Sequence, residues 1–282
     1  MNKLEMMFQE HIFKSTLFII LFYLTSFTSY SQESNAETWV DSIMLEMSPE
    51  QRISQLLMVS AYSNKSKSNV QDIEKLIKEY DIGGIMFLQG GPVRQAKLTN
   101  YYQSISQFPL MIALDAEWGV SMRLDSCIRF PWQMTLGAVQ DEKLIYQMGE
   151  EIARQCKLIG VHINFAPVVD VNFNPDNLII GNRSFGEDPK RVGELGIEYM
   201  KGLQENGVLA CAKHFPGHGD TDDDSHKTLP VINHSKKRLN DVEILPFKMM
   251  IKKGLGSIMV AHLHVPDLDD TENLASSLSP KI

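Results

Sequence analysis

Cysteine is scarce in this chain, and its spacing speaks against two cysteine-dependent architectures. The 282 residues contain three cysteines, Cys127, Cys156 and Cys211. An odd number with no close spacing indicates neither a disulfide framework nor a zinc ribbon. Cys211 lies between Ala210 and Ala212, and we predict that Cys156 and Cys211 are both small core residues.

Positive charge is in deficit as well. The chain has 27 Lys and Arg residues against 35 Asp and Glu residues, which gives a net charge of −8. The sequence contains no Lys- and Arg-rich stripe with interleaved aromatic residues, the usual mark of a nucleic-acid-binding surface. We therefore predict that nucleic acid is not a partner.

A glycine-rich phosphate-binding loop is also missing. Gly83 and Gly84 come before a predicted strand rather than after one, and Gly217-His-Gly219 opens no clear helix. A dinucleotide-binding loop needs its glycines between a strand and the helix that follows it. This absence disfavours a doubly wound nucleotide-binding fold.

Long apolar runs are absent except near the N-terminus. An apolar run from Leu17 to Phe27 follows Lys3 and Lys14, and small residues that include Ser31 come after it. The run is short for a membrane-spanning helix of about 20 residues. The order of these features predicts a secretory signal peptide over residues 1–31, with an uncleaved anchor as the alternative. We accordingly expect a periplasmic or secreted protein that meets the membrane only during export.

The rest of the chain alternates regularly between β and α patterns. Its composition, 43% hydrophobic and 22% charged, is typical of a globular protein with a sizeable core. The predicted strands cover residues 83–88, 110–114, 161–166, 208–212 and 257–261. The predicted helices between them cover residues 93–106, 141–158, 189–206 and 235–253. This alternation predicts a parallel α/β sheet.

Polar residues gather directly after the predicted strands. They are Asp115, Asp170, Lys213, His214 and His262. In a (β/α)8 barrel this is the face on which active sites are built. We therefore predict an α/β fold of the TIM-barrel type over residues 32–282, incomplete in this chain, with about five of the eight strands.

The densest polar segment is Lys213-His-Phe-Pro-Gly-His-Gly-Asp-Thr-Asp-Asp-Asp-Ser-His226, and its residues support two interpretations. In the first, His214, His218 and His226 bind a metal ion together with the neighbouring aspartates, as in a metal-dependent barrel hydrolase. In the second, Asp224 orients His226 and favours its charged form, so that the imidazole donates and accepts a proton near neutral pH.

The same segment carries a family resemblance. Its first half, Lys213–Gly219, followed by Asp224-Ser-His226, resembles the signature of glycoside hydrolase family 3, and more narrowly its NagZ-type β-N-acetylglucosaminidase branch. Further segments resemble the family's first helix, first three strands and a loop, in the same order. They are Ile53–Met58, Gly83–Leu88, Ile112–Glu117, Asn164–Asp170 and Asn182–Asp188.

The resemblance implies a barrel that hydrolyses terminal β-linked N-acetylglucosamine, or a related β-hexosaminide or β-glucoside, with retention at the anomeric carbon. It implies that His226 is the catalytic acid–base and that Asp224 orients it. The substrate contacts it implies are Asp115, Arg123, Arg183, Lys213 and His214. It implies a carbohydrate substrate derived from peptidoglycan or chitin, with no metal and no cofactor.

Two departures from the family pattern stand out. Where many relatives have Asp-x-Glu-Gly-Gly-Arg, this chain has Asp115-Ala-Glu-Trp-Gly-Val-Ser-Met-Arg123, in which Arg123 keeps its spacing from Asp115. The family's nucleophilic aspartate, in a later strand, has no match here, and we expect it beyond Ile282. A sugar-binding protein that retains Lys213, His214 and Arg183 without turnover is therefore a third interpretation.

Overall fold

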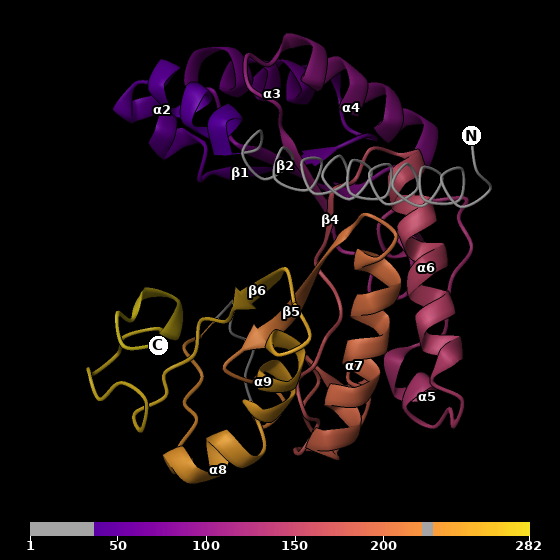
Figure 1. Ribbon diagram of the computed structural model, residues 1–282, viewed down its shortest axis with the longest axis vertical. Coiled ribbons are helices and arrows are strands. Elements are labelled where there is room, and N and C mark those ends of the chain that lie inside the picture. The colour runs from indigo at the N-terminus through magenta and orange to yellow at the C-terminus, as the bar shows by residue number, and fades with distance from the viewer. Residues whose placement is uncertain (1–36, 222–227) are drawn as a thin grey trace, which may run out of the picture. The chain divides into compact units, whose positions relative to one another are not determined.

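The computed structural model describes residues 37–221 and 228–282, which form two compact units (Figure 1). The first unit ends at Ile53. In it, residues 37–46 are helical, and α2 (Pro49–Ser54) begins after Ser48. Ser48 and Gln51 exchange hydrogen bonds between side chain and backbone, 3.2 and 2.8 Å long, as in a capping box. No helix in the described ranges is long and apolar enough to cross a bilayer.

The second unit, Ser54–Ile282, is built on a parallel sheet of six strands. The strands are β1 (Met58–Tyr62), β2 (Gly84–Gln89), β3 (Met111–Leu114), β4 (Ile163–Asn164), β5 (Leu209–Phe215) and β6 (Ser257–Val260). Their order in the sheet is the order in the sequence, and every neighbouring pair is parallel. This is the topology of part of a TIM-type barrel, as the sequence predicts. The additional strand is β1, which pairs with β2.

Helices connect the strands. They are α3 (Lys67–Tyr80), α4 (Pro92–Ile105), α5 (Gln133–Gly137), α6 (Lys143–Leu158), α7 (Pro189–Gln204), α8 (Lys236–Asp241) and α9 (Leu245–Ile251). Short 3-10 turns occur at η1 (Val120–Met122), η2 (Gly181–Arg183) and η3 (Ser276–Leu278). The single helix predicted over residues 235–253 is wrong in extent, because the structure divides it into α8 and α9.

Helices α6 and α7 run side by side against the sheet (Figure 1). Asp188 caps α7 by accepting a hydrogen bond from the backbone N–H of Arg191 at 2.9 Å, and Pro189 occupies the first turn. The two helices approach closely at Gly202, where an added Cβ would lie 2.3 Å from the carbonyl oxygen of Tyr146. The close approach buries the apolar face of α7 against α6.

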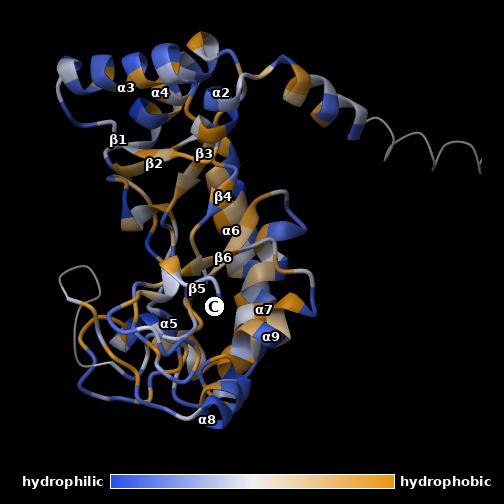
Figure 2. Ribbon diagram, turned by 90° about the vertical axis from the view of Figure 1, so that its left-hand side faces the viewer, coloured by the Kyte–Doolittle hydropathy of each residue, from blue (hydrophilic) through white to orange (hydrophobic). Residues whose placement is uncertain are grey.

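The core lies between the sheet and its helices. In Figure 2, β2 and β3 carry mostly hydrophobic residues, whereas α3 carries hydrophilic residues on its exposed side. Cys156 and Cys211 are buried as free thiols, which confirms the prediction that they are core residues. On the opposite face of the sheet, Ala113, Ile163 and Cys211 pack together. These three side chains come from the neighbouring strands β3, β4 and β5.

Candidate active site

A polar cavity of about 600 Å³ lies at the carboxyl ends of the strands. Its volume falls within the range of small-molecule sites. Its lining includes the apolar side chains of Met86 on β2 and Met259 on β6 and the charged side chains of Asp115, after β3, and Lys213, on β5. The cavity therefore occupies the face on which the sequence predicts the site.

Lys213 is the centre of a buried ion-pair network. Its ammonium lies 2.8 Å from Asp115 Oδ1 and 2.8 Å from Glu117 Oε1. Burial lowers the pKa of Lys213, but the two carboxylates outweigh it, so the net shift is upward. Lys213 is thus a fixed cation whose position is defined by two carboxylates.

Glu117 joins Lys213 to Arg183. The Arg183 guanidinium donates to Glu117 through Nε at 2.9 Å and through Nη2 at 2.7 Å, in the bidentate geometry that arginine forms with carboxylates. Burial raises the pKa of Glu117, but Lys213 and Arg183 lower it by more, so the pKa falls from 4.5 to about 2. Glu117 is fully buried, and the sequence does not identify it as a site residue.

Asp115 has a second cationic partner. The Arg123 guanidinium donates to its other oxygen, so the single carboxylate bridges Arg123 and Lys213. Burial raises the pKa of Asp115, but the two cations lower it overall. Arg123 keeps the spacing from Asp115 that the family pattern has, and the two residues are in direct contact. Asp115, Arg123, Lys213 and Arg183 all line the cavity.

His214 is held by a different carboxylate. Asp170, fully buried, lies 2.7 Å from His214 Nδ1, and it also accepts backbone N–H bonds from His214 at 3.1 Å and from His218 at 2.6 Å. Burial lowers the pKa of His214, against the opposing effect of Asp170, and so favours the neutral ring. Its Nε2 lies 3.5 Å from the Arg183 guanidinium and faces the cavity.

These contacts disfavour the metal-site interpretation of His214 and His218. Both ring nitrogens of His214 already face protein groups, Nδ1 the Asp170 carboxylate and Nε2 the Arg183 guanidinium. His218 Nδ1 lies 2.7 Å from the Thr221 hydroxyl. The third histidine of the segment, His226, and its partner Asp224 lie outside the described residues.

Aromatic side chains also line the cavity. Trp118 packs against Trp132 with ring centroids 4.1 Å apart, and both line the cavity. The Arg129 guanidinium lies 4.7 Å from the centroid of Trp132. A cavity lined by both charged groups and indole rings suits a ligand that has both hydroxyl groups and apolar C–H faces, as a pyranose does.

Comparisons with known proteins identify the family of the chain. The family model described as "Glycosyl hydrolase family 3 N terminal domain" matches residues 48–282. Beta-hexosaminidase A of Pseudoalteromonas piscicida is 39% identical over 215 residues, which are 71% of this chain and 36% of that protein.

Two solved structures are similar as well. The family 3 β-N-acetylglucosaminidase from Paenibacillus sp. str. FPU-7 superposes with a TM-score of 0.77 at 36% identity, over 83% of this chain and 45% of that one. The β-glucoside phosphorylase BglX superposes with a TM-score of 0.81 at 28% identity, over 86% and 44%. The chain spans less than half the length of each of these three proteins. It belongs to glycosyl hydrolase family 3, whose N-terminal domain its residues 48–282 match.

Proposed function

We propose that this chain provides the sugar-binding pocket of a retaining β-N-acetylglucosaminidase that removes terminal β-linked N-acetylglucosamine. The observation that carries the proposal is the cavity above the strand ends, where Asp115, Arg123, Arg183, Lys213 and His214 all line one space. The similarity to beta-hexosaminidase A and to the Paenibacillus β-N-acetylglucosaminidase supports this choice of sugar.

In this proposal the ion pairs hold hydrogen-bonding groups in place for the sugar hydroxyls. Asp115 accepts from hydroxyl groups, while Lys213 and Arg183 donate to them. His214 presents Nε2 to the same space. Hydrogen bonds to charged groups contribute about 1.5–3 kcal/mol each, and two or three of them fix the orientation of one ring.

The proposed chemistry is a double displacement. His226, oriented by Asp224, gives a proton to the glycosidic oxygen as the C1–O bond breaks, and an aspartate forms a bond to C1. In the second step His226 takes a proton from water, whose oxygen replaces the aspartate at C1. The aspartate comes from sequence beyond residue 282 and must lie about 5–5.5 Å from the acid–base group for retention.

We further propose that residues 1–31 are a signal peptide and that residues 32–282 are the barrel domain, cut short before its nucleophile. The enzyme would then act in the periplasm or outside the cell. Its substrates would be fragments of peptidoglycan or chitin that carry N-acetylglucosamine at the non-reducing end. The apolar run after Lys3 and Lys14 supports export.

The test is turnover of p-nitrophenyl N-acetyl-β-glucosaminide, whose leaving group is not a sugar, by the natural full-length protein, followed by proton NMR of the first-formed sugar. We expect N-acetylglucosamine to appear first as the β-anomer, at a rate that inorganic phosphate does not change. Appearance of the α-anomer first would contradict retention. Formation of a sugar 1-phosphate that depends on phosphate would instead make the protein a phosphorylase.

A binding experiment separates the pocket from the chemistry. The 282-residue chain, titrated calorimetrically with N-acetylglucosamine, should bind one sugar, and Lys213→Met should abolish binding. Lys248→Met, on the exposed part of α9, is the matched control. Equal affinity of the chain and of Lys213→Met would exclude the cavity as the sugar site.

A further inference from the structure

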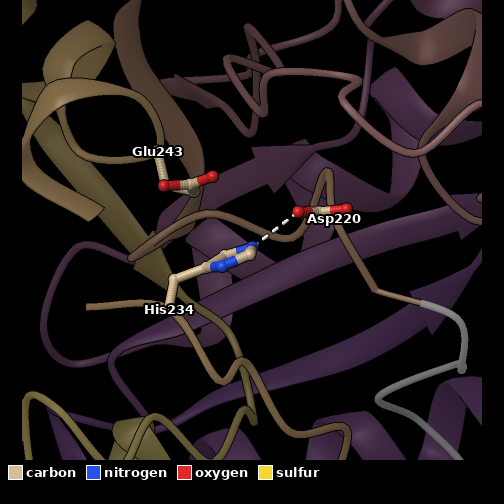
Figure 3. Close-up of side chains that lie close together, drawn as sticks. All are labelled: Asp220, His234 and Glu243. Atoms are coloured by element: carbon tan, nitrogen blue, oxygen red, sulfur yellow. Dashed lines mark hydrogen bonds and ion pairs between the residues drawn. The ribbon is translucent and has the colours of Figure 1, made fainter. Parts of the chain in front are cut away.

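A second cluster of ligand-type side chains lies apart from the sugar cavity. In the sequence, Asp220 comes after β5, His234 comes before α8, and Glu243 comes after α8. Their side chains lie close together (Figure 3). One nitrogen or oxygen atom of each residue lies within 4.8 Å of the other two. None of the three lines the cavity that contains Asp115.

Glu243 has an unsatisfied oxygen that is inaccessible to solvent. Glu243 as a whole is 2% exposed. Oε1 accepts a hydrogen bond from Arg238 Nη2 at 3.0 Å, whereas Oε2 has no partner in the part of the chain that the structure describes. Burial raises the pKa of Glu243, against opposing effects of Arg238 and His234. A buried carboxylate oxygen without a partner is unfavourable, and it calls for a ligand or a proton.

The local charges leave a place for a cation. His234 Nε2 lies 2.6 Å from Asp220 Oδ2, and Arg238 Nη2 lies 3.8 Å from the same oxygen. Arg238 is held over the ring of Phe173, 4.2 Å from its centroid, and contacts Glu243 through Oε1. The single guanidinium of Arg238 therefore faces the carboxylates of Asp220 and Glu243. Oε2 of Glu243 is left to bind another positive group.

We propose that Asp220, His234 and Glu243 bind a divalent transition metal ion of the Zn²⁺ class. Imidazole nitrogen favours Zn²⁺ over the hard ions Mg²⁺ and Ca²⁺, and carboxylate oxygens complete the set. Tetrahedral ligands at bond lengths of about 2.1 Å stand about 3.4 Å apart. To reach that geometry, His234 Nε2 and Asp220 Oδ2, now 2.6 Å apart, would separate by about 0.8 Å, and ligand atoms up to 4.8 Å apart would approach by up to about 1.4 Å.

The site has a defined structural consequence. Asp220 belongs to the segment that follows β5, while His234 and Glu243 belong to the segments that flank α8. A shared metal ion would tie these segments together. Because it binds the folded chain and not the unfolded one, it would raise the melting temperature. The site is separate from the sugar pocket and does not depend on the proposed glycosidase activity.

The experiment is calorimetric titration of the metal-free chain with ZnCl₂, with MgCl₂ in parallel. We expect one Zn²⁺ per chain, a rise in melting temperature on binding, and no response to Mg²⁺. His234→Gln and Glu243→Gln should each weaken Zn²⁺ binding at least tenfold. Two variants are intended to retain it: His262→Gln, at an exposed histidine that contacts Ser277, and His226→Ala.

Circular dichroism and melting without metal establish that each variant is folded. Asp220→Asn, whose side chain is partly exposed, replaces either Gln variant that does not fold. Undiminished Zn²⁺ binding in the folded variants overturns the proposal. So does loss of Zn²⁺ binding in His226→Ala alone, because the ion would then bind at the predicted acid–base pair. Absence of Zn²⁺ binding to the wild-type chain also overturns it.

Discussion

Replacing Glu117 by glutamine tests the buried ion-pair network more directly than any other change. Glutamine keeps the size of the side chain, removes its charge and turns one acceptor oxygen into an NH₂ donor that faces cations. Glu117 contacts Lys213 at 2.8 Å and Arg183 at 2.7 and 2.9 Å. Removing one partner of a buried ion pair costs about 3–5 kcal/mol, because the remaining charges are left uncompensated.

The pKa of Glu117 leads to a similar figure. Its value in the folded chain is lowered from 4.5 to about 2. A shift of this size corresponds to about 3 kcal/mol of stability. Because the folded-state pKa is the lower one, this stabilisation is fully present above 4.5 and disappears as the pH falls towards about 2. Glu117→Gln should therefore cost about 3 kcal/mol near neutral pH and progressively less in acid.

Glu151→Gln is the matched control. The pKa of Glu151 is also lowered to about 2, through hydrogen bonds from Arg154 and Gln155. However, its side chain is 36% exposed and that of Arg154 is 61% exposed. Solvent screens such a pair, so its loss should cost at most about 1 kcal/mol.

The assay is urea unfolding of both variants and of the wild type, followed by circular dichroism near neutral pH and at about pH 3. A cost for Glu117→Gln no larger than that for Glu151→Gln would refute the reasoning. So would a cost that stays the same between the two pH values. Either result would mean that the network around Lys213 is not the stabilising unit that its distances indicate.

Three further predictions concern single residues. Arg183→Lys keeps the charge but cannot bond Glu117 through two parallel N–H groups. In the full-length protein, steady-state kinetics with chitobiose should therefore give a kcat/KM about 10- to 100-fold lower than the wild-type value. An unchanged kcat/KM would show that Arg183 is not a site residue. Tyr199→Phe removes a hydroxyl that donates to the carbonyls of Ala116 at 2.9 Å and Glu117 at 3.1 Å. It should cost about 1–2 kcal/mol in thermal unfolding with KM unchanged, and an unaffected melting temperature would contradict this. His226→Ala in the full-length protein should slow turnover of chitobiose about 10²- to 10⁴-fold, and wild-type turnover would exclude His226 as the acid–base group.

The positions of Asp115, Lys213 and His214 could be predicted because they follow predicted strands, although β5 itself extends through Lys213 and His214 to Phe215. In a parallel sheet all carboxyl ends lie at one edge, so residues 98 positions apart, such as Asp115 and Lys213, meet there. The structure confirms this proximity. Their roles in sugar binding, and the roles of Arg123 and Arg183, stay predictions.

Glu117 could not be identified in the same way. It lies two residues after Asp115 in a segment without periodicity, and its partner Arg183 is 66 positions away. A glutamate after a strand is ordinarily solvated. Its burial becomes favourable because Lys213 on β5 and Arg183 of η2 neutralise it, and no local sequence pattern predicts these two contacts.

Strand β1 and the break between α8 and α9 could not be predicted from the sequence for a related reason. The segment Met58–Tyr62 is short and only partly buried, and it gains its strand conformation from pairing with β2. Glu243 lies at the break, where its side chain is drawn into a buried contact with Arg238. In both places tertiary contacts override a weak local preference.

The pairing of charges around the cavity has a consequence for ionic strength. The cations Arg123, Arg183 and Lys213 stand against the carboxylates of Asp115, Glu117 and Asp170. Because the protein already balances these charges, an uncharged sugar brings no new ion pair and displaces no counterions. Bulk salt screens such buried pairs weakly. Under the proposed function, the affinity for N-acetylglucosamine should therefore be nearly the same in dilute buffer and in concentrated NaCl, because the placement of hydroxyl groups rather than long-range attraction would determine it.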